Sequence, residues 1–170
     1  MLNPKLVVTG AHLSKKFGLT VKEILKGKYN IVAKVKNLVI SDKPVSRLAS
    51  ASKQLLKLTK IVNREKPDLM IAPFDREESI TTALAGTYMN IPVAHLGAGE
   101  KTKFNVDGVI RHSVTKLSNI FFCITKENAK RVMKLGEERK RIFVVGHTAV
   151  DRYKNIKPLS KSYLSNYLNL

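Results

Sequence analysis

Tryptophan is absent from this chain of 170 residues, aromatic residues make up 6% of it, and it has one cysteine. Proteins that hold single-stranded nucleic acid usually stack the bases on aromatic side chains, so this composition disfavours that class. A lone cysteine also lacks the other ligands that a metal site needs. Cys123 lies in the apolar run IFFCIT, and we expect it to be a buried small hydrophobic residue.

Long hydrophobic runs are missing as well. No stretch of 18 apolar residues occurs, and Met1 leads into a short strand pattern instead of the apolar core of a signal peptide. The sequence therefore indicates no membrane partner, and we expect the protein to be cytoplasmic. With 44% hydrophobic residues the chain can bury one core, which favours a single domain.

Acidic residues are scarce. The chain has 13 Asp and Glu and 31 Lys and Arg, which gives a net charge of +18. Such an excess attracts polyanions, so nucleic acid, anionic membranes and phosphorylated ligands all have to be considered. The lysines are nevertheless spread along segments such as KENAKRVMK, which is typical of the solvated faces of amphipathic helices. We therefore do not expect nucleic acid to be a specific partner.

Strand and helix patterns alternate along the chain. Apolar runs predict strands or extended segments over residues 5–10, 30–40, 69–74, 91–96, 119–125 and 141–147. Helical patterns fill the intervals, and they begin at Thr20, at Asp42 and Pro44, near Ile80, near Ile110 and at Thr125. Strands that are apolar throughout and separated by helices favour a Rossmann-like α/β fold, with a parallel sheet covered by helices on both faces.

Two helices carry specific expectations. Thr20 and Glu23 have the spacing of a capping box, and that helix should end near Gly27. The helix opened by Asp42 and Pro44 is longer. Its apolar positions at the helical period are Leu48, Ala51, Leu55, Thr59 and Val62.

We expect residues 1–153 to form the α/β lobe and residues 154–170 to form a loosely attached tail. The tail is rich in Lys, Asn and Ser. Four of its residues have the spacing of one last amphipathic turn, namely Tyr163, Leu164, Tyr167 and Leu168.

Chemically active side chains follow two of the expected strands. Asp75 and Arg76 come after one strand, while His95 ends another and leads into a glycine loop that carries Glu100. In open α/β sheets, sites form at the carboxyl ends of the strands. The sequence therefore predicts that acids, a base and cations gather at one edge of the sheet.

Several motifs in register resemble the hydrolysing UDP-N-acetylglucosamine 2-epimerase family across nearly the whole chain. They are TGAHLSKKFG at 9–18, the pair Asp75 and Arg76, NIPVAH at 90–95, the pair Gly99 and Glu100, IRHSVTKLS at 110–118 and VVGHTAVDRY at 144–153.

The resemblance implies a GT-B-like enzyme of two Rossmann-like lobes with a UDP-sugar substrate bound between them. Such an enzyme eliminates UDP and then adds water to release N-acetylmannosamine, with no NAD cofactor and typically no obligate metal. It implies that Asp75, Asp107 and His95 are catalytic. It implies that the substrate-binding residues are Arg76, Glu100, Arg111, His112 and His12.

Structural roles remain open for several of these residues. Asp75 and Asp107 each precede an expected helix, so either carboxylate can instead be a helix N-cap. Glu100 can be solvated or can accept hydrogen bonds from backbone N–H groups, and His12 can be a partly buried polar group. Arg111 can belong to a solvated helix face, although a cationic helix beside a cleft also suits a diphosphate.

The chain also departs from the family pattern. Gly97 stands where relatives place an acid or a histidine, and Gly108 stands where they place a second acid. By the resemblance, this chain starts after the family's first strand, with its arginine-bearing turn and the helix that follows, and it stops near the interlobe hinge. We therefore expect a truncated amino-terminal lobe, with an exposed sheet edge and little activity alone.

Two functions remain open at this point. One is a sugar-nucleotide 2-epimerase, either as a truncated gene product or as one half of a split enzyme whose second lobe is a separate chain. The other is a non-catalytic basic α/β domain that binds an anionic partner, which can be a nucleotide-sugar, a protein or nucleic acid. A homo-oligomer is also left open as a partner.

Overall fold

The computed structural model describes residues 2–41, 43–102, 105–154 and 156–169. The strands within these ranges are β1 (Lys5–Thr9), β2 (Asn30–Val35), β3 (Met70–Pro73), β4 (Val93–Leu96), β5 (Ile120–Cys123) and β6 (Ile142–Val144). The helices are α1 (Val21–Lys26), α2 (Pro44–Glu65), α3 (Glu77–Tyr88), α4 (Val106–Lys116), α5 (Lys126–Lys134), α6 (Thr148–Lys154) and α7 (Lys161–Leu168). Short 3₁₀ turns cover Gly10–Leu13, Lys15–Phe17 and Arg139–Arg141.

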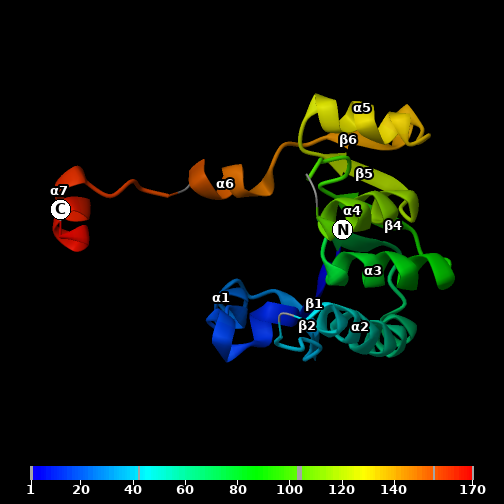
Figure 1. The fold of residues 1–170 in the computed structure, drawn as a ribbon, viewed down its shortest axis with the longest axis horizontal. Coiled ribbons are helices and arrows are strands. Elements are labelled where there is room, and N and C mark those ends of the chain that lie inside the picture. Colours follow the sequence, from blue (N-terminus) through cyan, green and yellow to red (C-terminus); the bar gives the residue numbers. More distant parts are fainter. Residues whose placement is uncertain (1, 42, 103–104, 155, 170) are drawn as a thin grey trace.

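The strands are parallel, as predicted, but they form two sheets instead of one. β1 pairs with β2, and the second sheet has the order β3-β4-β5-β6. In Figure 1 the smaller sheet lies below, with α1 and α2, and the larger sheet rises above it with α3, α4 and α5. The expectation of one continuous sheet was therefore wrong in this respect, because no hydrogen-bonded ladder joins β1 to β3.

Helices lie on both faces of this arrangement, as expected for a Rossmann-like fold. From β1 to β2 the chain steps across the fold in one direction, and from β3 to β6 it steps across in the opposite direction. Because each crossover between parallel strands is right-handed, α1 lies on one face and α3, α4 and α5 lie on the other. The main core forms between the larger sheet and the helices α2, α3 and α4. Its buried members are Leu58, Val62, Met70, Ala72, Ala83, Ala85, Val93 and Val114.

A second core cluster lies where α5 covers β5 and β6. It consists of Ala98, Phe121, Cys123, Ala129, Val132 and Ile142. Cys123 is fully buried in this cluster, which confirms the prediction of a small hydrophobic role, and burial raises the pKa of its thiol to about 11. Thr125 begins α5 by accepting a hydrogen bond from the backbone N–H of Asn128 at 3.2 Å, also as predicted.

The long helix α2 confirms the predicted apolar face only in its second half, where Val62 is buried and Leu55 packs against the core. Its first half buries polar residues instead. Leu48 is 69% exposed, whereas Ser50 and Gln54 are buried. The cause is Asn37, which follows β2 and donates from its side-chain nitrogen to Gln54 Oε1 at 2.9 Å. A buried amide needs hydrogen-bonding partners, so polar residues of α2 turn towards it. Asp42, the expected first residue of this helix, lies outside the described residues.

The capping box expected at the start of α1 was wrong. Thr20 makes no side-chain cap, and its hydroxyl oxygen lies 2.8 Å from Nδ1 of His12 instead. The helix does end at Gly27, as expected.

The expected amphipathic turn in the tail is the helix α7. Its Tyr163 and Tyr167 rings stack with centroids 6.2 Å apart, and none of its described side chains is buried. α6 and α7 extend to the left of the sheets in Figure 1. Among the described residues, no helix is both long and apolar enough to cross a bilayer.

Candidate functional site

The turns that follow β3 and β4 bring two of the candidate residues, Asp75 and Glu100, to a third, Arg111. After β3 the chain passes through Phe74, at a left-handed φ of 61°, and presents Asp75. After β4 it passes through Gly97 at φ 83°, where the backbone N–H donates to the Phe122 carbonyl of β5 at 2.9 Å. A Cβ at Gly97 would stand 2.8 Å from the Phe74 ring. Glycine therefore allows the two turns to approach each other closely.

Arg111 joins these two turns. Its guanidinium bonds to Asp75 from the first turn and to Glu100 from the loop after the second, and these three residues are called the Arg111 cluster. The same group donates to the carbonyl of Gly97 at 3.3 Å. Arg111 is only 4% exposed, so the solvated-face interpretation was wrong for it. A buried guanidinium with two carboxylate partners fixes the relative position of both loops.

His95 of β4 is fully buried. Its Nε2 is 2.8 Å from the carbonyl oxygen of Phe74, and its Nδ1 is 3.0 Å from the Thr115 hydroxyl. Since a carbonyl can only accept, Nε2 carries the proton and Nδ1 is the acceptor. Burial lowers the pKa of His95 to about 4, against the opposing effect of the bond to Phe74. The ring is therefore neutral at pH 7, and it supports the turn that carries Asp75.

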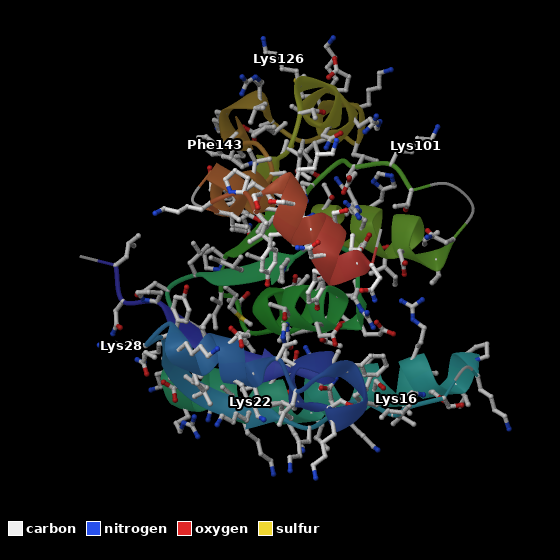
Figure 2. All side chains as sticks on the ribbon, turned by 90° about the vertical axis from the view of Figure 1, so that its left-hand side faces the viewer. Lys16, Lys22, Lys28, Lys101, Lys126 and Phe143 are labelled. Carbon is white, nitrogen blue, oxygen red and sulfur yellow. The ribbon has the colours of Figure 1, made fainter. Side chains whose placement is uncertain are left out.

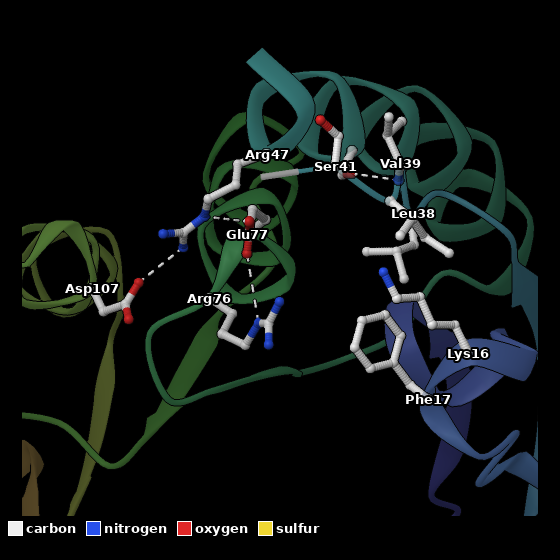
Figure 3. A pocket seen from close by; sticks show the side chains of 11 residues that line it. Lys16, Phe17, Leu38, Val39, Ser41, Arg47, Arg76, Glu77 and Asp107 are labelled. Carbon is white, nitrogen blue, oxygen red and sulfur yellow. Dashed lines mark hydrogen bonds and ion pairs between the residues drawn. The ribbon is translucent and has the colours of Figure 1, made fainter. Parts of the chain in front are cut away.

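Asp107 belongs to a separate group. It accepts a hydrogen bond from Arg47 Nη2 at 2.9 Å, and Arg47 Nε lies 2.5 Å from Glu77, so these three residues are called the Arg47 cluster (Figure 3). The hydrogen bonds to Glu77 and then Asp107 raise the pKa of Arg47. Partial burial works to raise the pKa of Glu77, but the Arg47 bond and nearby positive charge outweigh it, and the net pKa is lowered.

A pocket of about 340 Å³ opens beside the Arg47 cluster (Figure 3). Its lining comes from four parts of the chain that are far apart in sequence. The residues are Lys16, Phe17, Leu38, Val39, Ile40, Ser41, Arg47, Ser50, Arg76, Glu77 and Asp107. Three cationic side chains and two carboxylates thus share one concave surface, which suits a polar ligand that carries negative charge.

Arg76 precedes α3 and lines this pocket. Its Nε is 3.6 Å from both Glu77 Oε2 and Glu78 Oε2. Both carboxylate oxygens are buried without a hydrogen bond among the described residues. The Arg76 side chain is 60% exposed, so its guanidinium remains accessible to a ligand.

The two remaining candidates are histidines with different surroundings. His12 is exposed and bonds to Thr20 in its own segment, away from the partners of either cluster. His112 follows Arg111 on α4 and is half-buried, and its Nδ1 is buried without a hydrogen bond among the described residues.

The structure overturns the helix-cap interpretation of both aspartates. α4 begins after Asn105, whose side chain accepts from the Gly108 N–H at 3.2 Å, and Asp107 bonds to Arg47 instead. α3 has no side-chain cap, and Asp75 bonds to Arg111. Arg47 and Glu77 were not predicted as site residues, because nothing in their local sequence distinguishes them from solvated helix charges.

The described residues contain no group of three or more His, Cys, Asp or Glu side chains placed to hold a metal ion.

Comparison with known proteins gives consistent matches. A family model for UDP-N-acetylglucosamine 2-epimerase matches residues 1–169. The chain is 37% identical to the hydrolysing GDP/UDP-N,N'-diacetylbacillosamine 2-epimerase of Campylobacter jejuni, over 99% of this chain and 44% of that protein. It is 32% identical to the hydrolysing UDP-N,N'-diacetylbacillosamine 2-epimerase of Legionella pneumophila, over 89% of this chain and 40% of that protein. The chain thus spans less than half the length of these curated relatives.

Solved structures show the same fold. UDP-N-acetylglucosamine 2-epimerase from Rickettsia bellii matches with a TM-score of 0.73 at 14% identity, over 99% of this chain and 52% of that one. MnaA from S. aureus, solved with UDP, matches with a TM-score of 0.70 at 20% identity, over 98% and 51%. The fold of this chain corresponds to about half of each of these GT-B-like proteins.

Proposed function

Because this chain belongs to the UDP-N-acetylglucosamine 2-epimerase family, we propose that it is the part of a hydrolysing sugar-nucleotide 2-epimerase that acts on the sugar. The observation that carries this proposal is the Arg111 cluster, in which a buried guanidinium holds carboxylates from two strand ends. Since the chain spans less than half of its curated relatives, we propose that a second lobe completes the site.

The proposed reaction has two stages. A base first removes the proton from C2 of the sugar, the electron pair of that bond forms a C1–C2 double bond, and UDP leaves C1 with the electrons of its bond. Water then adds its hydroxyl to C1, and a proton returns to C2 on the opposite face, which releases N-acetylmannosamine. The C2 proton is weakly acidic, so the reaction needs a positioned base and stabilisation of the departing diphosphate.

We assign these tasks to the residues that the fold gathers. Asp75 and Asp107 are the proposed proton-transfer groups, each ion-paired with a different arginine. Two acids in different environments can divide acid and base roles. His95 was predicted to be catalytic, and the geometry favours a positioning role, because both of its ring nitrogens are already bonded.

The remaining proposed substrate-binding residues serve recognition. Arg76 and Arg111 supply positive charge suited to a diphosphate or to a developing negative charge. Glu100, His112 and His12 keep their proposed roles in substrate binding.

The two glycines limit the proposed activity. By the family resemblance, Gly97 and Gly108 stand where relatives carry acids or a histidine, and a general acid or base is worth about 10² to 10⁴ in rate. A Cβ at Gly108 would stand 2.8 Å from the Thr102 hydroxyl oxygen, so restoring an acid there requires a local shift. We expect the completed protein to turn over more slowly than its relatives.

A chimera tests the proposal. The matched region of the Campylobacter jejuni relative would be replaced by this chain, with the preceding and following segments of that protein kept. We expect the chimera to release UDP from UDP-N-acetylglucosamine or from UDP-N,N'-diacetylbacillosamine. Asp75→Asn should reduce that rate by about 10² or more. Lys130→Gln, at an exposed position of α5, should leave it unchanged.

The outcome separates the two functions. A folded chimera that releases no UDP from either compound contradicts the enzymatic proposal. Binding of UDP without release would favour the second candidate, an anion-binding domain without catalysis. The observation that favours this candidate is the pocket lined by Lys16, Arg47 and Arg76. Figure 2 also shows Lys16, Lys22 and Lys28 around the blue segment at the protein surface. A cytoplasmic location, a separate second lobe and a homo-oligomer remain proposals.

A further inference from the structure

Lysine is concentrated in the segment that carries α1 and β2. Residues 15–36 contain seven lysines, no arginine and one acidic residue, Glu23. That carboxylate pairs with Lys26 at 2.9 Å, so the segment has no acid left to offset its other lysines. More broadly, residues 1–66 carry 15 Lys and Arg against 3 Asp and Glu, a net +12 of the total of +18. The positive charge of the chain is therefore concentrated in its first part.

The helix α1 turns its lysines away from the fold. Val21 is buried and Ile24, three residues later, is half-buried, so this face of the helix packs inwards. Lys22 and Lys26 lie one turn apart on the outward face. Leu25 stands at the border between the two faces and is 52% exposed. An apolar side chain thus lies next to a pair of lysines in solvent.

The surface is hollowed beside Leu25. Tyr29 is 60% exposed, and its ring lies against the end of α1, because a Cβ at Gly27 would stand 2.2 Å from it. The hollow has a volume of about 450 Å³ and is lined by Leu25, Tyr29, Ile31, Ala33 and Lys34. Apolar groups from α1 and β2 therefore meet here next to a lysine.

Six exposed residues of this region are called the α1–β2 surface, namely Lys22, Leu25, Lys26, Lys28, Tyr29 and Lys34. In Figure 1, α1 lies to the left of β1 and β2, and α2 lies to their right. Figure 2 shows Lys22 and Lys28 along the blue segment that faces the viewer. The α1–β2 surface thus belongs to the outside of the fold, on the side away from α2.

We propose that the α1–β2 surface docks on a lipid bilayer that contains anionic lipids. The lysines would lie among the headgroup phosphates, and Leu25 and Tyr29 would enter the boundary of the acyl chains. Lysine suits this position because its aliphatic stem packs on apolar groups while the ammonium group stays in the polar layer. Tyrosine is likewise enriched at the boundary between water and lipid.

The composition of the surface favours lipid over nucleic acid. Arginine is the usual residue for bidentate recognition of phosphates and bases, and residues 15–36 contain none. An exposed leucine such as Leu25 gains free energy by entering acyl chains, which a nucleic-acid backbone does not offer. Docking on a surface needs no membrane span, so the absence of long apolar runs does not bear on it. Docking also does not depend on the proposed function, because it is measured without turnover.

Co-sedimentation with vesicles tests the proposal. The full chain would be mixed with vesicles of phosphatidylglycerol and phosphatidylcholine in equal parts, and with vesicles of phosphatidylcholine alone. We expect binding to the first vesicles and none to the second. Binding should weaken as salt is added, because a shorter Debye length screens the lysines from the phosphates.

Two triple variants with the same change of charge locate the binding surface. Lys22→Gln, Lys28→Gln and Lys34→Gln together should weaken vesicle binding about a hundredfold, since one lysine near an anionic surface is worth about fivefold in affinity. The control changes three exposed lysines of α5 to glutamine, namely Lys126, Lys130 and Lys134. We expect the control to weaken binding by less than about threefold, because α5 lies at the far end of the fold in Figure 1.

A further variant tests the apolar part of the surface. Leu25→Ser with Tyr29→Ser keeps every charge, and it should weaken binding about tenfold because less apolar area enters the lipid. Both side chains are exposed, so the variant should fold, and circular dichroism checks this for each variant. If the first triple variant does not fold, the comparison of the two vesicles and the serine variant still decide.

Several results would overturn the proposal. They are equal binding to both kinds of vesicle, no binding to either, and equal losses in the two triple variants. Unchanged binding of the serine variant would also overturn it, because the contact would then be one of charge alone. Duplex DNA provides the last arm. If it displaces the vesicles, and if its own binding is lost in the first triple variant and kept in the serine variant, the surface binds nucleic acid and the assignment to lipid is wrong.

Discussion

At the scale of single residues, His95 links the site to acid stability. Its pKa is lowered from 6.5 to about 4, so the folded protein keeps the ring neutral while the unfolded chain protonates it. The contribution of His95 to the free energy of unfolding is fully present above pH 6.5. It falls by about 3 kcal/mol as the pH is lowered to 4. Urea unfolding at a series of pH values measures this loss.

His95→Gln provides the control for that measurement. Glutamine can still donate to the Phe74 carbonyl but does not titrate, so the variant should lose less stability between pH 6.5 and 4. Parallel stability curves for the two proteins over this interval would show that His95 is not the cause.

Residue chemistry also explains which site contacts were predictable. Asp75 and Glu100 follow neighbouring parallel strands, and the sequence predicted their approach because carboxyl ends of such strands meet at one edge. Their shared partner Arg111 was named, but its burial was not foreseen. Arg47 comes from α2, and its meeting with Asp107 depends on how two helices pack, which no local pattern encodes.

At the scale of elements, the turn at Gly97 combines two separate constraints. Gly97 and Gly136 both have left-handed φ values, 83° and 89°, but only Gly97 has a side chain within reach of an added Cβ. We expect Gly136→Ala to cost about 1 kcal/mol of unfolding free energy, from backbone strain alone. Gly97→Ala should cost about 1 to 2 kcal/mol more, because the Phe74 ring has to move. Urea unfolding of both variants provides the comparison, and equal costs would contradict the close approach of the two turns.

The positions of most strands and helices could be predicted from the sequence, but the side of a helix that is buried could not always be predicted. The periods of strand and helix predicted the six strands, the helices α1 to α5 and the tail turn that forms α7, but not α6. The face that the first half of α2 buries was missed, because the buried Asn37 bonds to Gln54 and to the Ser50 carbonyl while Leu48 lies in solvent. The split of the sheet was also missed, since strand propensity does not specify which strands pair.

At the scale of the whole molecule, the tail contributes little to the folded body. None of the described side chains of α7 is buried. Deleting residues 156–170 should therefore shift the melting temperature by no more than about 2 °C, as expected for an element whose described side chains are not buried. Differential scanning calorimetry of the shortened and full chains measures this, and a larger fall would show that the tail packs against the lobe.

The buried thiol of Cys123 reports how often the core around it opens. It is the chain's only thiol, it is fully buried between β5 and α5, and burial raises its pKa to about 11. The nucleophilic thiolate is therefore both scarce and shielded while the fold is closed. A maleimide can react only after that part of the core opens. The rate of alkylation therefore measures the opening of this part of the core, and each molecule reacts once.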